Sequence, residues 1–269
     1  MSITPSQKPH REWLWLILAL LLVGGVTVPL WQWATPAEAT AEYWTRWGGG
    51  RLVKLLLGPE QIACYLCFVW AGFMMLSRYR EVLRQRTAFS FDLLPTDVGA
   101  KILPEDARPL VRKIEASARQ RPYILVKMVH TALNKFAVSR KAADVGEVVR
   151  NQAEIEQDRL VTTMAMVTYL AWAIPAIGFL GTVRGLAGAM SLAGNQSDKE
   201  FTKTVADQLG VAFDCTLVAL ALTIPLMYMI YAVQKLEELL VIDSHAYCQE
   251  NLLLRLYDPE PEPAYLSTN

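Results

Sequence analysis

Residues 173–190 read Ala-Ile-Pro-Ala-Ile-Gly-Phe-Leu-Gly-Thr-Val-Arg-Gly-Leu-Ala-Gly-Ala-Met, an apolar segment in which glycine and alanine predominate. Steps of three and four residues stay on one face of a helix, and here they collect small residues and one hydroxyl. That face comprises Pro175, Gly178, Thr182, Gly185 and Ala189. Gly181 and Gly185 also have the four-residue spacing at which membrane helices pack closely. The segment predicts a transmembrane helix that another helix can approach closely.

Residues 210–225 read Gly-Val-Ala-Phe-Asp-Cys-Thr-Leu-Val-Ala-Leu-Ala-Leu-Thr-Ile-Pro and predict a second helix with a matching face. That face comprises Ala212, Thr216, Ala219, Thr223 and Leu226. Two hydroxyls therefore lie along a groove of small apolar side chains. They either relay a proton or order water, or they bond to carbonyl groups of their own helix and have no further role.

The register of the two helices follows if they form a hairpin centred near Lys199. Positions whose numbers add up to 398 then lie at the same height, which pairs Thr182 with Thr216 and Arg184 with Asp214. Each charged residue is two positions from its threonine, about 200° around the helix, and points away from the threonine face. Unpaired charges at this depth are costly, so we expect an Arg184–Asp214 ion pair within or between subunits. The functional alternative makes Asp214 a proton-handling carboxylate.

Three uncharged runs in the chain reach the length of about 20 residues that crosses a bilayer, and a fourth is shorter, at 17 residues. They cover residues 13–37, 61–77, 160–183 and 215–234, in a chain that is 53% hydrophobic. We predict an all-α membrane protein with four transmembrane helices, at about 13–33, 60–77, 160–193 and 208–234. The first run, which follows Lys8 and Arg11, is either a retained helix, which we favour, or a cleavable signal sequence.

The distribution of basic residues predicts the orientation of these spans. Sixteen Lys and Arg residues lie between positions 78 and 160, against three between 34 and 60 and two between 194 and 208. Basic loops face the cytoplasm, so both chain ends are expected there. We expect a membrane region with two spans and an external loop, a cytoplasmic helical domain, a hairpin, and a cytoplasmic helix with a disordered tail. Their predicted ranges are 1–77, 78–159, 160–234 and 235–269.

Several classes of function lack support in the sequence. The formal net charge of zero gives no global electrostatic argument for binding nucleic acid. The chain has neither a P-loop nor a nucleophile elbow, so we do not expect an enzyme. Cys64 and Cys67 could form a metal or redox pair, but we favour packing residues. The three histidines are scattered, so no metal site or cofactor is predicted.

One pattern joins the two apolar segments. It reads Pro175-x-x-Gly178-x-x-Gly181-Thr182-Val183-x-Gly185, followed by Thr216 and then by Ile224-Pro225. This pattern, within residues 159–234, resembles the MotA/TolQ/ExbB proton-channel family. Two departures are Arg184, where members often carry an apolar or aromatic residue, and Val211, where many carry an acidic one.

The resemblance implies a homopentamer with a pore-lining hairpin, which in this chain follows two peripheral helices. The sequence itself predicts that both hairpin helices have long cytoplasmic extensions, since no proline interrupts residues 142–174 and the last helix is expected to run to Tyr257. The pentamer would surround a dimer of an ExbD, TolR or MotB-type single-span partner, which supplies the proton-accepting aspartate. Thr182, Thr216 and Thr223 would face the proton pathway. The expected packing positions against a partner helix are Pro175, Gly178, Gly181, Gly185, Ala189, Ala212, Ala219 and Pro225.

The function so implied is that of a proton-conducting subunit of a rotary motor in the bacterial inner membrane, coupling proton motive force to mechanical work. A further periplasmic or cytoplasmic effector is compatible with it. The process that receives the work stays open among outer-membrane import, envelope constriction, flagellar torque, gliding and defence, as does proton against sodium. The alternatives are a non-conducting oligomeric membrane scaffold and, less favoured, a small-solute transporter.

Overall fold

The structure is a computed structural model, and it describes residues 10–34, 55–91, 93–94, 101–117, 123–191 and 198–257. Its helices are α1 (His10–Ala34), α3 (Pro59–Arg86), α4 (Pro104–Ser117), α5 (Ile124–Ser139), α6 (Ala142–Ser191) and α7 (Asp198–Asn251). Two short 3-10 helices follow α3 and α7, namely η1 (Thr87–Ser90) and η2 (Leu253–Arg255). Among the described residues, the one β-bridge joins Ile102 to Leu256. The predicted all-helical class is confirmed.

Four of these helices, α1, α3, α6 and α7, are long and apolar enough to cross a membrane. They contain the predicted spans 13–33, 60–77 and 208–234, and α6 contains residues 160–191 of the predicted span 160–193. Two of them are much longer than a bilayer requires, at 50 residues for α6 and 54 for α7. Most of the predicted external loop and all of the predicted disordered tail lie outside the described residues.

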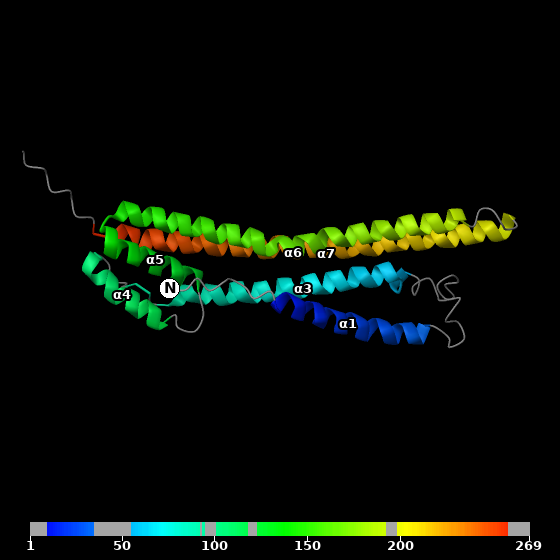
Figure 1. The fold of residues 1–269 in the computed structure, drawn as a ribbon, viewed down its shortest axis with the longest axis horizontal. Helices are drawn as coiled ribbons and strands as arrows, with labels where there is room; N and C mark the ends of the chain where they lie inside the picture. Colours follow the sequence, from blue (N-terminus) through cyan, green and yellow to red (C-terminus); the bar gives the residue numbers. More distant parts are fainter. Residues whose placement is uncertain are drawn as a thin grey trace, which may run out of the picture. The chain divides into compact units, whose positions relative to one another are not determined.

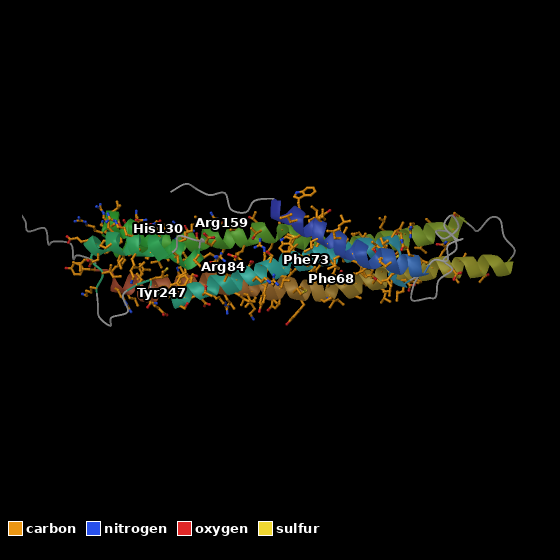
Figure 2. The ribbon with its side chains drawn as sticks, turned by 90° about the horizontal axis from the view of Figure 1, so that it is seen from below. Phe68, Phe73, Arg84, His130, Arg159 and Tyr247 are labelled. Atoms are coloured by element: carbon orange, nitrogen blue, oxygen red, sulfur yellow. The ribbon has the colours of Figure 1, made fainter. Side chains whose placement is uncertain are left out.

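The chain divides into two compact units, to both of which α3, α6 and α7 contribute. The first unit comprises residues 1–78 and 165–232, and the second comprises residues 79–164 and 233–269. Within the first unit, α6 and α7 lie side by side (Figure 1). On α3 of the same unit, the Phe73 ring stacks on Trp15 of α1, with ring centroids 5.7 Å apart (Figure 2).

Proline occurs inside both long helices of the first unit, at Pro175 and Pro225. Proline lacks a backbone N–H, and membrane helices tolerate it because neighbouring groups satisfy the freed carbonyls. Near Pro175, the Cys64 thiol of α3 donates to the Ile174 carbonyl at an S···O distance of 3.6 Å. Cys64 thus contributes a packing contact between α3 and α6.

The second unit has an apolar core formed by α4, α5 and the ends of α6 and α7. Its largest fully buried side chains are Ile114, Leu125, Met128, Leu133, Phe136 and Leu252. Polar contacts from α3 and α6 fix the position of α5. The Gln85 side chain accepts a hydrogen bond from the Ile124 N–H at 2.9 Å, which caps the first turn of α5. Lys127 bonds to the buried Glu156 carboxylate of α6 at 2.7 Å.

The end of α7 differs from the sequence-based expectation, which continued this helix to Tyr257. The helix ends at Asn251, and the chain then runs alongside the segment before α4. The Ile102 N–H donates to the Arg255 carbonyl at 2.8 Å, and the Tyr257 N–H donates to the Ile102 carbonyl at 3.0 Å. These pairings satisfy backbone groups that a continued helix would have bonded internally.

Candidate functional site

The candidate site lies in the first unit, where the small faces of α6 and α7 meet. A Cβ atom added to Gly178 would lie 2.5 Å from the Ala219 Cβ atom, and one added to Gly185 would lie 2.7 Å from the Ala212 Cβ atom. A Cβ atom at Gly181 would lie 2.8 Å from the Cys215 Cβ atom. No real pair of Cβ atoms approaches this closely, so the contact requires glycine at all three positions of α6.

Several small residues of this contact are positions that the sequence analysis assigned to packing against a partner. Gly178, Gly181, Gly185, Ala212 and Ala219 were expected to pack against the helix of a partner protein. In the structure they are buried and pack α6 against α7 of the same chain. The physical reason is that two small faces on consecutive antiparallel helices are complementary to each other, so they close together. Of the remaining three positions, Ala189 is buried, Pro175 is partly buried and Pro225 is exposed, and their role toward a partner stays a prediction.

The two central hydroxyls are in direct contact across this interface. The Oγ1 atoms of Thr182 and Thr216 are 2.6 Å apart, and either can donate to the other. Thr182 can also donate to the Gly178 carbonyl at 3.1 Å, as can Thr216 at 3.3 Å. A further acceptor for Thr216 is the Ala212 carbonyl at 3.4 Å. The contact between the two threonines is the one that the hairpin register predicted.

The third predicted hydroxyl does not join this pair. Thr223 lies seven residues beyond Thr216, about 10 Å along the helix. Its Oγ1 atom donates to the Ala219 carbonyl at 2.8 Å, four residues back in the same helix. The structure therefore gives Thr223 the local back-bonding arrangement alone, whereas Thr182 and Thr216 also contact each other across the two helices. The role of all three hydroxyls in a proton pathway stays a prediction.

The charged residue of α6 has a different partner from the one predicted. The Arg184 guanidinium pairs with the Glu60 carboxylate of α3 through two contacts, Nε to Oε1 at 2.9 Å and a terminal nitrogen to Oε2 at 2.9 Å. The predicted Arg184–Asp214 pair is therefore not formed within the chain. Since Arg184 lies about 200° around the helix from Thr182, its side chain points away from the α6–α7 contact. It reaches the neighbouring helix α3 instead.

Asp214 is partly buried, and no ion pair joins it to another described residue. Whether it pairs with a second subunit or handles a proton stays a prediction.

Glu60 is the site residue that sequence reasoning missed. It begins the second span, and an acidic residue beside an uncharged run resembles an ordinary flank at the membrane surface. The available signal was the arginine within the third span, since a charged group at membrane depth is expected to pair with an opposite charge on a neighbouring helix. Only the arrangement of α3 against α6 identifies which carboxylate that is.

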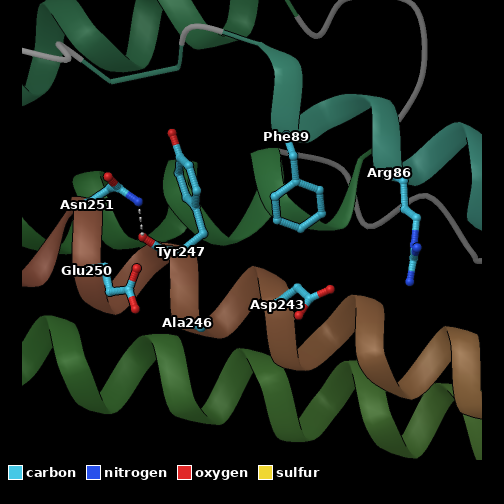
Figure 3. A pocket seen from close by; sticks show the side chains of 7 residues that line it. All are labelled: Arg86, Phe89, Asp243, Ala246, Tyr247, Glu250 and Asn251. Carbon is cyan, nitrogen blue, oxygen red and sulfur yellow. Dashed lines mark hydrogen bonds between the residues drawn. The ribbon is translucent and has the colours of Figure 1, made fainter.

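The second unit also has a pocket of about 470 Å³ between the end of α3 and the last turns of α7 (Figure 3). Its lining residues are Arg86, Phe89, Asp243, Ala246, Tyr247, Glu250 and Asn251. The rings of Phe89 and Tyr247 meet edge to face, with centroids 6.2 Å apart. The pocket contains none of the predicted site residues.

Comparison with known proteins gives one family. The family model described as the MotA/TolQ/ExbB proton channel family matches residues 120–242, which include the threonine pair and the glycines of the hairpin. Comparison with curated proteins gives no match. The matching family is one of channels and motor components rather than of enzymes, and with the four candidate spans it points to a multi-pass membrane protein. Residues 120–242 of this chain therefore match the MotA/TolQ/ExbB proton channel family, and this match confirms the resemblance seen in the sequence.

Proposed function

We propose that this chain is a proton-conducting subunit of an ion-driven rotary motor in the bacterial inner membrane. Five copies surround the transmembrane helices of an ExbD, TolR or MotB-type single-span partner. Both chain ends are cytoplasmic, and the second unit, with fifteen basic residues between positions 79 and 160, lies on that side. Proton flow past the partner is converted to mechanical work.

The observation that supports this proposal most directly is the contact between the Thr182 and Thr216 hydroxyls at 2.6 Å. The two hydroxyls have three alternative carbonyl contacts, to Gly178 from either side and to Ala212. Each hydroxyl can rotate, so the pair can reverse its donor direction without moving the backbone. A threonine hydroxyl can thus donate a hydrogen bond to a neighbouring partner carboxylate when that group is ionised. It can accept a hydrogen bond from the same group when it is protonated.

The hydroxyls do not titrate in the physiological range, so the proton itself requires a carboxylate. The partner's membrane-embedded aspartate is the carrier that the family resemblance implies. In this chain Glu60 is held by Arg184, whereas Asp214, two residues before Thr216, forms no ion pair with another described residue. We propose Asp214 as an accessory proton-handling group, and Asp214→Asn should lower flux at normal protein levels if it has that role.

The proposal is tested by purifying the chain together with the product of a neighbouring gene that encodes one membrane span and a periplasmic domain. When the outside solution is made more acidic, the interior of vesicles that contain the complex should acidify. The interior of vesicles that contain this chain alone should not. A variant partner whose membrane aspartate is changed to asparagine is the matched control and should abolish flux. A stable homo-oligomer that binds no such partner and conducts no protons would establish the scaffold instead.

A further inference from the structure

The pair of Glu60 and Arg184 joins positions 124 residues apart in the chain and lies at the level of the two central threonines. Both contacts are 2.9 Å, which is the two-pronged geometry that a guanidinium and a carboxylate form at their strongest. The Glu60 side chain is only 11% exposed, whereas the Arg184 side chain is 50% exposed. Glu60 is thus inserted between helices, and Arg184 covers it from the outside.

The surface that receives Glu60 is formed by both helices of the hairpin. A Cβ atom at Gly181 would lie 3.3 Å from the Glu60 Cγ atom, so the stem of Glu60 occupies space that the missing side chain leaves. The Cys215 Sγ atom lies 4.0 Å from the Glu60 Oε2 atom. Glu60 therefore contacts α6 and α7 at once, at the place where Gly181 and Cys215 face each other.

The hydroxyl pair lies next to the two hairpin residues that Glu60 contacts. Thr182 directly follows Gly181, and Thr216 directly follows Cys215. Consecutive residues of a helix differ by about 1.5 Å in height and about 100° in direction. The Gly181–Cys215 contact under Glu60 and the Thr182–Thr216 contact are therefore adjacent contacts between α6 and α7, one residue apart along each helix. A change in the spacing of the helices at one contact changes it at the other.

From this geometry we propose that Glu60 is a positioning residue, which with Arg184 holds α3 against the α6–α7 crossing and keeps the Thr182 and Thr216 hydroxyls in contact. Glu60 lies outside residues 120–242, so the family match does not include this contact. The positioning of the hydroxyls is a property of the fold. Its consequence for proton flux rests on the proposed function.

The experiment measures the hydroxyl contact without relying on flux. Thr182 and Thr216 are both replaced by cysteine in a chain whose four native cysteines are replaced by alanine, and the loss of free thiols under mild oxidation is followed by labelling. Since the parent oxygen atoms are 2.6 Å apart, a disulfide should form readily. Glu60→Gln should slow this reaction by about threefold to tenfold, the range that interhelical polar contacts in membranes produce.

Charge exchange separates positioning from a general loss of structure. The double variant Glu60→Arg/Arg184→Glu should restore most of the oxidation rate, because the ion pair is re-formed in reverse. If Glu60→Gln is not recovered from membranes, Glu60→Gln/Arg184→Gln replaces it, because this double variant leaves no unpaired charge. Its cysteine pair should oxidise at a rate between those of the parent and of a chain without the ion pair's contacts. Glu81→Gln is the matched control, because Glu81 pairs with Arg84 of its own helix, and it should oxidise at the parent rate.

The proposal is overturned if the cysteine pair oxidises at the same rate in Glu60→Gln and in the parent, or if it oxidises as slowly in the exchanged pair as in Glu60→Gln. Proton flux of the same Glu60 variants, made in the native background, is measured in parallel. If oxidation follows the expected order while the native complex conducts no protons, the proposed function fails and the positioning role stands. If the native complex conducts and every Glu60 variant matches its parent in oxidation and in flux, the positioning role alone fails.

Discussion

The close approach of α6 and α7 predicts a large effect for the smallest possible substitution, Gly178→Ala. The added Cβ atom would lie 2.5 Å from the Ala219 Cβ atom, whereas ordinary contact begins at 3.4 Å. The helices must therefore separate locally by about 0.9 Å, or neighbouring atoms must deform. A separation of that size would stretch the 2.6 Å hydroxyl contact of Thr182 and Thr216 to the outer limit of a hydrogen bond.

The expected destabilisation follows from overpacking, which typically raises the free energy of the folded state by about 1–3 kcal/mol. Gly210→Ala is the matched control, because a Cβ atom there has nothing within 4 Å. That control gains helix propensity of about 0.5–1 kcal/mol without a clash. Thermal unfolding in detergent, followed by circular dichroism, should give Gly178→Ala a lower Tm than Gly210→Ala, by about 2–4 °C for each kcal/mol.

A compensating change makes this prediction sharper. In Gly178→Ala/Ala219→Gly the closest remaining neighbours of the new Cβ atom are the Cys215 carbonyl and the Thr216 Cα atom, both at 3.4 Å. The double variant should therefore regain most of the lost stability. Equal unfolding temperatures for Gly178→Ala and Gly210→Ala would refute the close contact, as would a double variant no more stable than Gly178→Ala.

Two further predictions concern the second unit. Gln85→Ala removes the acceptor that caps α5 at the Ile124 N–H and should lower the free energy of unfolding by about 1 kcal/mol, while Gln157→Ala on an exposed face of α6 should have little effect in the same denaturation assay. Burial raises the pKa of the Cys248 thiol from 9.0 to about 12, so its thiolate fraction at neutral pH is about a thousandfold smaller than that of an ordinary thiol. Maleimide should leave Cys248 unmodified in the folded protein and modify it after denaturation; rapid labelling of the folded chain would contradict its burial.

The hairpin contact could be predicted from the sequence because it depends on local regularities. Helical periodicity sets which residues share a face, and a short connection between antiparallel helices sets their relative height. Those two constraints were enough to bring Thr182 and Thr216 together, and the hydroxyls are indeed 2.6 Å apart. Helix length was likewise readable, since no interruption separates the polar start of α6 at Ala142 from its apolar part.

The partner of Arg184 could not be predicted in the same way. Height alone placed Asp214 opposite Arg184, but an ion pair also needs both side chains to point toward each other. Arg184 points to α3, whose position depends on packing between segments more than a hundred residues apart. The small faces show a related limit, because a surface suited to close helix contact does not reveal whether the helix that it contacts is in the same chain.

The end of α7 illustrates a third limit. Residues 252–257 continue an apolar pattern that suits a helix, yet the chain leaves the helix after Asn251 and bonds to Ile102. Backbone groups at a helix end accept any well-placed partner, and here that partner comes from a segment about 150 residues earlier. Such long-range backbone pairing has no local sequence signal.

The central proposal is that the Thr182 and Thr216 hydroxyls assist proton conduction by bonding to the partner's carboxylate, and a comparison of two double variants tests it most directly. Two methyl groups cannot approach to the 2.6 Å that separates the oxygen atoms, so replacement by valine would push the helices apart. Thr182→Ala/Thr216→Ala removes both hydroxyls without added bulk, and Thr182→Ser/Thr216→Ser keeps them while losing the same two methyl groups.

Proton flux is measured in vesicles that contain equal amounts of each assembled complex. Loss of about 1 kcal/mol of hydrogen bonding per hydroxyl should slow the alanine variant by about tenfold or more, while the serine variant stays close to the native rate. Equal flux from the alanine and serine variants, at equal assembly, would contradict a role for these hydroxyls in conduction.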